Sequence, residues 1–343
     1  MDLSFVEMMP LASLIVDEAL RIHPGENAVI VTDSRVGRYP GAGQIIKALA
    51  AALAERGIEF NVVTFRARNV RGDSIPVPTL DILRNADAAV LLVSQSYLYT
   101  ASWHTVMRGK NKARMITLPP AEDAKGTDNL FYKLPKTKED FYSVAEVGEK
   151  LAKVLSPGKH IARVTAANGT DVTFSMNDLS RMIGTGKAVE PGTFSGLPAG
   201  GCSVGIGGGD ACGTIVFDRR FNLFKQRYLA DPIILRVDQG RIFDISGGSE
   251  ARQFESYVDA LPYDREKILN VAEFGLGFNP LASMDGVDAG EWELVLGAAH
   301  FGIGADAGFG GSVAVPFHED GMIENASVEI DGVMITDNGR FLI

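Results

Sequence analysis

Short apolar runs alternate with amphipathic segments in the N-terminal part of the chain. The segment from Gln44 to Arg56 is alanine-rich, carries its apolar residues at helical spacing and stops at Gly57. Helical patterns also cover residues 8–22 and begin again at 80–84. The apolar runs between them have the length and composition of buried strands, at 27–32, 60–65, 88–93 and 114–118. Strands that alternate with helices predict a parallel α/β sheet with right-handed crossovers.

The pattern changes after a charged segment at 122–158, which predicts a helix over 139–155 and ends at Ser156-Pro157-Gly158. The remaining residues are rich in Gly, Val and Thr, and Asn168-Gly169 is a strong hairpin signal. Only 249–261 and 264–269 have a helical pattern, whereas short strands are predicted at 161–166, 171–174, 213–217, 233–238 and 241–245. We therefore expect an α/β domain with a parallel sheet over 1–158 and a β-rich, α+β domain over 159–343.

Composition and charge narrow the class of protein. Of the 343 residues, 46% are hydrophobic and 22% are charged, which is typical of a globular protein. The net charge of −10 argues against nucleic acid or an anionic membrane as the main partner. No apolar stretch reaches membrane-spanning length, the first residues lack the pattern of a signal peptide, and two cysteines make no disulfide framework. These features predict a cytoplasmic protein that acts on a small molecule.

Two polar loops follow predicted parallel strands, where ligands of such sheets usually bind. They are Asp33-Ser34-Arg35 and Ser94-Gln95-Ser96, and an ordinary solvated loop is the alternative interpretation of each. Glycines follow the first loop at Gly37, Gly41 and Gly43, but they spell neither a dinucleotide fingerprint nor a phosphate-binding loop. The sequence therefore argues against a nucleotide cofactor.

The candidate chemistry lies in the C-terminal third of the chain. His318 and Asp320 are two residues apart and would share one face of a strand, where an imidazole and a carboxylate suit Zn, Mn or Fe(II). His300 stands among glycines that allow close backbone approach, and Glu273 is a lone carboxylate in an apolar run, where it requires a cation or strong donors. Each alone has an ordinary structural interpretation. Together they predict a site for a divalent metal ion, with Glu273, His300, His318 and Asp320 as candidate ligands.

Several motifs resemble those of the M29 metallo-aminopeptidases, the aminopeptidase T or S type. In the C-terminal third these are Glu273-x-Gly275-x-Gly277-x-Asn279-Pro280, His300-x-x-x-Gly304, His318-x-Asp320, Asp331-Gly332 and Asp337-Asn338-Gly339-Arg340-Phe341. Earlier segments that are similar to the family are 168–174 and 191–200. The resemblance covers most of the chain and implies an α/β N-terminal domain, a β-rich C-terminal domain and a homodimer.

The chain also departs from the M29 family at two positions that bear on the metal site. A metal-binding glutamate of the family falls at Gly201 and a catalytic tyrosine at Ala307, so the resemblance implies one divalent metal ion, held by Glu273, His300, His318 and Asp320, and not a two-metal site. The chain also resembles shortened members of the superfamily, the 2,5-dihydroxypyridine 5,6-dioxygenases, which hold one Fe(II) with two histidines and an aspartate. Their His-x-Asp matches His318 and Asp320, while their other histidine falls at Glu273.

Three functions stay open at this point. The first is a metal-dependent hydrolase of a small amide or peptide-like substrate, with Glu190 or Asp306 as the catalytic base. The retained Glu273 and His300 favour it. The second is an Fe(II) dioxygenase that cleaves a hydroxylated pyridine or related aromatic ring, which the loss at Gly201 favours. The third is a family member that binds metal without catalysis.

Overall fold

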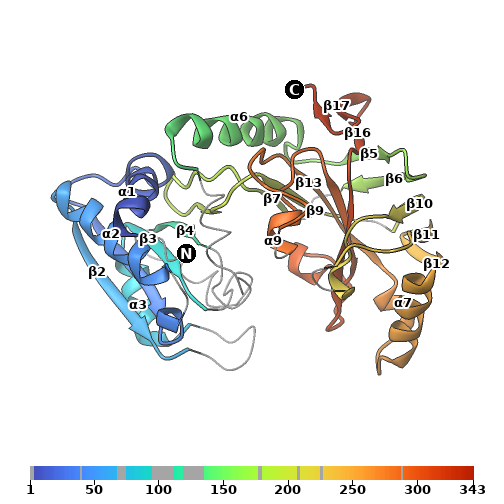
Figure 1. The fold of residues 1–343 in the computed structure, drawn as a ribbon, viewed down its shortest axis with the longest axis horizontal. Coiled ribbons are helices and arrows are strands. Elements are labelled where there is room, and N and C mark those ends of the chain that lie inside the picture. Colours follow the sequence, from blue (N-terminus) through green and yellow to red (C-terminus); the bar gives the residue numbers. More distant parts are fainter. Residues whose placement is uncertain are drawn as a thin grey trace. The chain divides into compact units, whose positions relative to one another are not determined.

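The computed structural model describes residues 4–38, 41–67, 75–94, 112–118, 135–176, 180–206, 209–224, 227–286 and 289–343. The chain forms two compact units, each described by itself below (Figure 1). The first unit contains Met1–Glu146 and Gly184–Ala199, and the second contains Val147–Ile183 and Gly200–Ile343. The units are thus interleaved along the chain, whereas the sequence predicts one boundary between residues 158 and 159.

The first unit is built on a five-stranded parallel sheet in the order β2-β1-β3-β4-β8. Its strands are β1 (Asn27–Asp33), β2 (Glu59–Phe65), β3 (Ala88–Leu92), β4 (Arg114–Thr117) and β8 (Phe194–Gly196). The helices among the described residues are α1 (Phe5–Leu14), a π-helix (Ile15–Ala19), a 3-10 turn (Val36–Arg38), α2 (Ala42–Glu55), α3 (Val77–Asn85) and α6 (Lys138–Val154), which continues into the second unit. The predicted α/β unit with a parallel sheet is confirmed.

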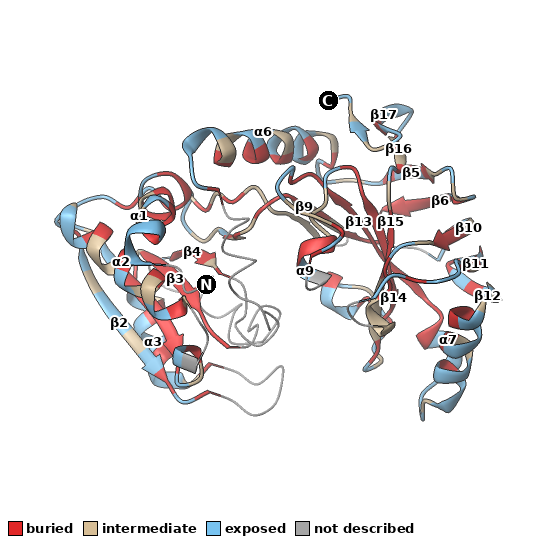
Figure 2. Ribbon diagram, in the orientation of Figure 1, coloured by how far each residue is buried: buried red, intermediate tan, exposed pale blue. Residues whose placement is uncertain are grey.

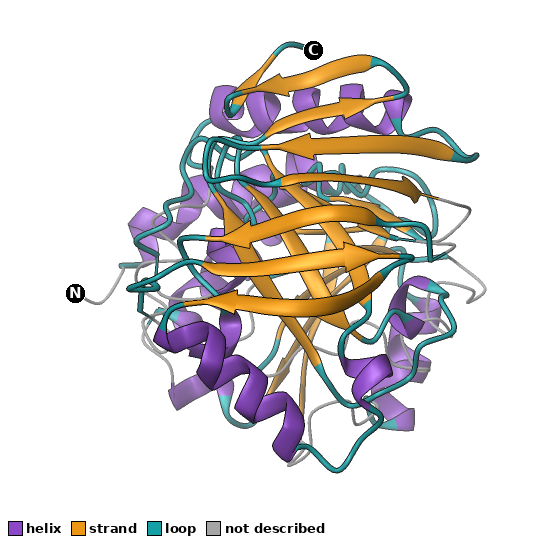
Figure 3. Cartoon of the chain, turned by 90° about the vertical axis from the view of Figure 1, so that its right-hand side faces the viewer, coloured by secondary structure: helices purple, strands orange, loops and turns teal. Residues whose placement is uncertain are grey.

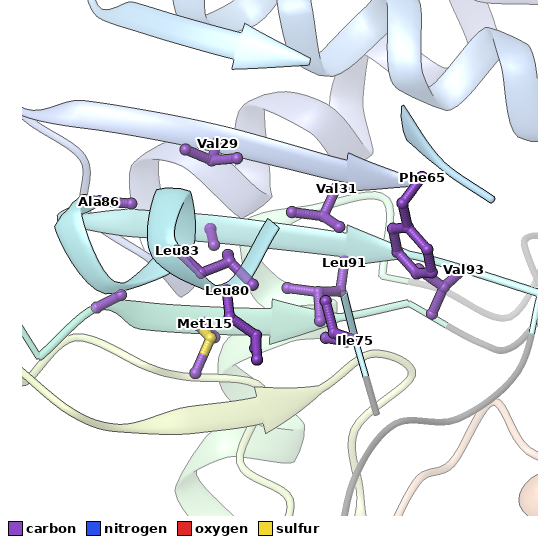
Figure 4. Packing of buried hydrophobic residues seen from close by; sticks show 12 residues of the cluster. Val29, Val31, Phe65, Ile75, Leu80, Leu83, Ala86, Leu91, Val93 and Met115 are labelled. Atoms are coloured by element: carbon purple, nitrogen blue, oxygen red, sulfur yellow. The ribbon is translucent and has the colours of Figure 1, made fainter. Parts of the chain in front are cut away.

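Alternate side chains of the central strands pack under α3. Val29 and Val31 of β1 and Leu91 of β3 belong to one buried apolar cluster with Leu80 and Leu83 of α3 (Figure 4). Such short, continuous apolar runs suit strands that are covered on both faces. This is why the sequence pattern locates these strands well.

Polar residues at the carboxyl ends of β1 and β3 bind each other. The buried carboxylate of Asp33 accepts hydrogen bonds from the backbone N–H and the hydroxyl of Ser94, both at 2.7 Å. Residues 95 and 96 of the second predicted loop lie outside the described residues. This interaction links the two predicted loops. It engages the side chain of Asp33, which is the only carboxylate in the loop Asp33-Ser34-Arg35.

The second unit stacks two antiparallel sheets whose strands cross at a steep angle (Figure 3). Phe174 of one sheet contacts Phe274 and Phe301 of the other, with ring centroids 5.2 and 5.7 Å apart. The larger sheet has the order β12-β11-β10-β6-β5-β16-β17-β18. It comprises β5 (His160–Thr165), β6 (Asp171–Met176), β10 (Cys212–Phe217), β11 (Ile233–Asp238), β12 (Arg241–Gly247), β16 (Ser327–Ile330), β17 (Val333–Asp337) and β18 (Arg340–Phe341).

The smaller sheet has the order β15-β14-β13-β9-β7. It comprises β7 (Arg181–Ile183), β9 (Gly201–Gly205), β13 (Val271–Gly277), β14 (Ala299–Gly304) and β15 (His318–Ile323). Helices α7 (Ser249–Ala260), α8 (Arg265–Ile268) and α9 (Ala289–Trp292) and the 3-10 turns Asn222–Phe224 and Ala307–Phe309 complete the unit. The predicted β-rich domain is therefore confirmed. Among the described residues, no helix is long and apolar enough to cross a membrane.

His160 at the start of β5 makes stability of the second unit depend on pH. Its Nδ1 lies 2.7 Å from Asp331 Oδ2 and its Nε2 lies 2.7 Å from the Ser156 carbonyl oxygen. The Ser156 carbonyl and the Asp331 carboxylate raise the pKa of the His160 imidazole. The contribution of the charged imidazole is complete below about pH 6.5, its unfolded-state pKa, and is lost as the pH rises through the folded-state value.

We therefore expect His160→Gln to lower the free energy of unfolding by on the order of 1 kcal/mol near pH 6 and by less above the folded-state pKa. Urea unfolding from pH 5.5 to 9 measures this difference. The control Asp331→Asn keeps the shape of the partner but removes its charge, and should flatten the same pH dependence. If His160→Gln lowered the free energy of unfolding by the same amount at every pH, the result would contradict this account.

Candidate metal centre

Three neighbouring strands of the smaller sheet place the predicted ligands on one face. Glu273 of β13 is paired with Gly302 of β14, and Gly302 is paired with Asp320 of β15. Residues paired across antiparallel strands, and residues two apart along a strand, point to the same side. His318 and His300 therefore share the face of Glu273 and Asp320, opposite the face that packs against the larger sheet.

Glycines on this face provide the space that the ligands occupy. A Cβ atom at Gly302 would lie 2.6 Å from His318 Nε2 and 2.9 Å from Asp320 Oδ1. A Cβ atom at Gly275 would lie 1.9 Å from His300 Cε1. Glycine weakens a strand interior, so its repeated use marks close approach of other groups. The glycine-rich pattern of β13 and β14 thus belongs to the site.

Glu273, His318 and Asp320 form a three-donor set. One ligand atom from each lies within 4.8 Å of the other two. His318 Nε2 is 3.0 Å from Glu273 Oε2 and 3.3 Å from Asp320 Oδ1. His318 Nδ1 lies 2.7 Å from the Ala305 carbonyl oxygen, which can only accept, so Nδ1 carries a proton and Nε2 is the ring nitrogen that would bind a metal ion.

The two carboxylates concentrate negative charge at the set. Burial opposes charge on Glu273, but hydrogen bonds from His300 and His318 outweigh it and lower the pKa of Glu273 to about 2. Burial also opposes charge on His318, yet the pKa of His318 rises because Asp320 and Glu273 lie beside it. Asp320 Oδ1 is buried without a hydrogen-bond partner among the described residues. A divalent cation would satisfy this oxygen and neutralise the carboxylates, so the residues fit a metal ion.

His300 lies behind the donor set rather than in it. Its Nε2 is 3.4 Å from Glu273 Oε1, the oxygen that does not contact His318. Burial opposes charge on His300, but Glu273 and Glu293 outweigh it and raise the pKa of His300 to about 9. The ligand role predicted for His300 stays a prediction. The geometry favours a role in orienting Glu273, as donors behind a ligand commonly do.

His300→Gln should therefore retain about one metal ion per chain, with an affinity on the order of 10- to 100-fold lower. Competition with a coloured chelator measures the affinity, and elemental analysis measures the stoichiometry. Complete loss of metal, with the fold intact by circular dichroism, would make His300 a ligand instead.

The two predicted bases are not members of the three-donor set, and the role of each as a base stays a prediction. Glu190 is exposed in a turn of the first unit, where its carbonyl oxygen accepts from the Thr193 N–H and hydroxyl at 3.1 and 2.6 Å. Asp306 is buried, and its carboxylate accepts from the Val313 N–H at 2.6 Å and from Asn270 Nδ2 at 3.4 Å. Asp306 therefore holds the loop after β14.

Two further residues, which the sequence did not single out, lie at the centre. Asn222 Nδ2 donates to Asp320 Oδ2 at 3.1 Å. Burial and the neighbouring Asp320 charge raise the pKa of the partly buried Glu293 to about 8. A Cβ atom at Gly201 would lie 2.8 Å from Leu294 Cδ2, so the chain segment that carries Glu293 covers the position of the missing glutamate. No local motif marks Asn222 or Glu293, because folding brings them to the site from distant segments.

Comparison with known proteins identifies the family. A model of the 2,5-dihydroxypyridine 5,6-dioxygenase family (NicX) matches residues 16–343. The chain belongs to this family. No curated protein matches the sequence.

Two solved structures share the fold of this family member. The structure of 2,5-dihydroxypyridine dioxygenase from Pseudomonas putida KT2440 has a TM-score of 0.79 and 18% identity, covering 99% of this chain and 98% of that chain. Wild-type AmpT from Thermus thermophilus has a TM-score of 0.58 and 14% identity, covering 98% of this chain and 99% of that chain. At these identities the likeness shows the fold, and it confirms the aminopeptidase-like architecture that the motifs predict.

Proposed function

We propose that this protein is an Fe(II)-dependent dioxygenase that cleaves a hydroxylated pyridine or a related aromatic ring. The observation that carries the proposal is the match of the dioxygenase family model to residues 16–343. It is supported by the donor set of Glu273, His318 and Asp320, because three protein ligands leave positions open for substrate and oxygen. Bound Fe(II) would supply the electron chemistry that allows O₂ to react with the ring.

The protein's own residues would hold the metal ion and orient its ligands. Glu273 and Asp320 offer carboxylate oxygens, and His318 offers Nε2 because the Ala305 carbonyl fixes its tautomer. Two carboxylates give the set a harder, more negative character than two imidazoles and one carboxylate would give. His300 orients Glu273 from behind through its Nε2.

A metal-dependent hydrolase of a small amide or peptide-like substrate is the second candidate. The observation that favours it is the carboxylate of Glu273, because oxygen-rich donor sets also suit Mn and Zn in hydrolytic sites. In that reaction the metal ion would make bound water more acidic and polarise the substrate carbonyl.

Oxygen uptake separates the two functions. Protein loaded anaerobically with Fe(II) and mixed with 2,5-dihydroxypyridine and O₂ should consume one O₂ for each ring cleaved, followed by an oxygen electrode and by loss of the ring absorbance. The same preparation, or its Mn and Zn forms, should release no leucine from Leu-peptides. Peptide hydrolysis without oxygen uptake by protein that holds one metal ion per chain would replace the dioxygenase with the hydrolase.

A further inference from the structure

A short segment of the second unit, Arg220–Asn222, lies along the free edge of β15. Phe221 forms an antiparallel bridge with Gly321, and the Met322 N–H donates to the Arg220 carbonyl oxygen at 2.8 Å. In this register Arg220 and Asn222 point to the face that carries Asp320, while Phe221 points to the opposite face. The segment thus extends the metal-binding sheet beyond its last strand.

Phe221 fixes the segment from the core side. It is 1% exposed, and its ring lies 5.4 Å from Phe217 and 5.0 Å from Phe254 between centroids. Gly321 opposite leaves room for the Phe217 ring, which a Cβ atom there would meet at 2.3 Å. The segment therefore has one register on β15, because a shift by one residue would turn Phe221 out of this aromatic cluster.

Arg220 fixes the segment from the other side. Its guanidinium carbon lies 3.9 Å from the ring centroid of Tyr228 and 4.8 Å from that of Trp292. Its Nε donates to the Met284 carbonyl oxygen at 3.1 Å, and the residue is 5% exposed. A buried, stacked guanidinium holds its position more strictly than a solvated one, because its planar fork and ring faces allow few arrangements.

We propose that Asn222 is a positioning residue that sets how Asp320 meets the metal ion, and that Arg220 and Phe221 hold Asn222 in place for this purpose. Asn222 Nδ2 donates a hydrogen bond to Asp320 Oδ2. The other carboxylate oxygen, Oδ1, faces His318 Nε2 at 3.3 Å. Asp320 then binds through one oxygen and leaves a coordination position for another ligand. The inference rests on the metal site of the proposed function, but not on the reaction that occurs there.

Cobalt(II) titration of the metal-free protein tests the proposal without any assay of activity. Asn222→Leu keeps the volume of the side chain but removes the donor, which frees Asp320 to bind through both oxygens. We expect a change in the visible Co(II) spectrum toward higher coordination, with weaker absorption, and an affinity on the order of 10- to 100-fold lower. Arg220→Lys keeps the charge but loses the planar stack, and should change the spectrum in the same direction.

The neighbouring Arg219→Ala is the matched control. Arg219 pairs with Glu324 at 2.7 Å and is 44% exposed, so its loss should leave spectrum and affinity within about twofold of wild type. An unchanged Co(II) spectrum in Asn222→Leu with one ion still bound would overturn the proposal, even if thermal stability falls. Such an outcome leaves the dioxygenase proposal intact, whereas failure of oxygen uptake by the wild type leaves the role of Asn222 intact.

Discussion

The His318→Ala protein is expected to lose its metal ion while it keeps its fold. Nε2 of His318 is the only imidazole donor of the three-residue set and lies within 3.3 Å of both carboxylates. Loss of a residue that only supports a ligand lowers metal affinity about 10- to 100-fold. Removing the ligand itself should cost more than about 100-fold and reduce catalysis to background. Asp320→Ala should also lose the metal ion, because it removes Oδ1, a ligand atom of the set that is buried without a hydrogen-bond partner among the described residues.

Elemental analysis after gel filtration, with circular dichroism on the same samples, measures both expectations. His318 is partly exposed and sits at the start of an edge strand, so the fold should survive its truncation. His23→Ala, which removes an exposed histidine of the first unit, is the control and should retain metal. Stoichiometric metal in both His318→Ala and Asp320→Ala would show that the site is assigned to the wrong residues.

Gly302→Ala is expected to destroy the site with a single methyl group. The added Cβ atom would lie 2.6 Å from His318 Nε2 and 2.9 Å from Asp320 Oδ1, closer than van der Waals contact permits. Both atoms are ends of side chains, so they can move aside and the strand can persist. The free energy of unfolding should fall by about 1–3 kcal/mol, while metal affinity falls by more than about 100-fold because two ligands are displaced together.

Gly308→Ala is the matched control, since a Cβ atom there meets nothing within 4 Å. Isothermal titration with metal and urea unfolding of both variants separate loss of the site from loss of stability. If Gly302→Ala binds metal like Gly308→Ala, the donor atoms do not occupy the space above Gly302.

The sequence predicts most accurately the elements that have a simple local signature, such as a short apolar run or an Asn-Gly turn. The strands at residues 27, 60, 88 and 114 lie where their apolar runs place them, and the Asn168-Gly169 turn joins β5 to β6 as predicted. Gly169 adopts a φ of 101° in this turn, which explains the need for glycine. Local residue chemistry suffices for such elements.

Strands β13 and β14 were not predicted, although they carry the site. All residues of β13 are buried, so no polar and apolar alternation marks it (Figure 2). Its glycines lower strand propensity further, yet Gly275 is needed because His300 fills the space over it. The features that hide these strands in the sequence are the same features that build the metal centre.

The structure brings together three of the four residues that the sequence proposes as metal ligands. The spacing of His318 and Asp320 in one strand was sufficient to place them together, and Glu273 joins them across two strands. Asn222 and Glu293 were missed because their approach depends on long-range packing, which no local pattern encodes. Glu190 was suspected from its residue type alone; it belongs to the first compact unit, and its role as a base stays a prediction.

Anomalous X-ray diffraction from crystals of the protein grown with Fe(II) under nitrogen, or with Zn or Mn, tests the central claim most directly. The account predicts one strong metal peak per chain in contact with Glu273, His318 Nε2 and Asp320 Oδ1, with His300 turned toward Glu273 and not bound to the metal. A metal peak elsewhere on the chain, or metal-soaked crystals in which these three side chains hold no metal ion, would contradict it.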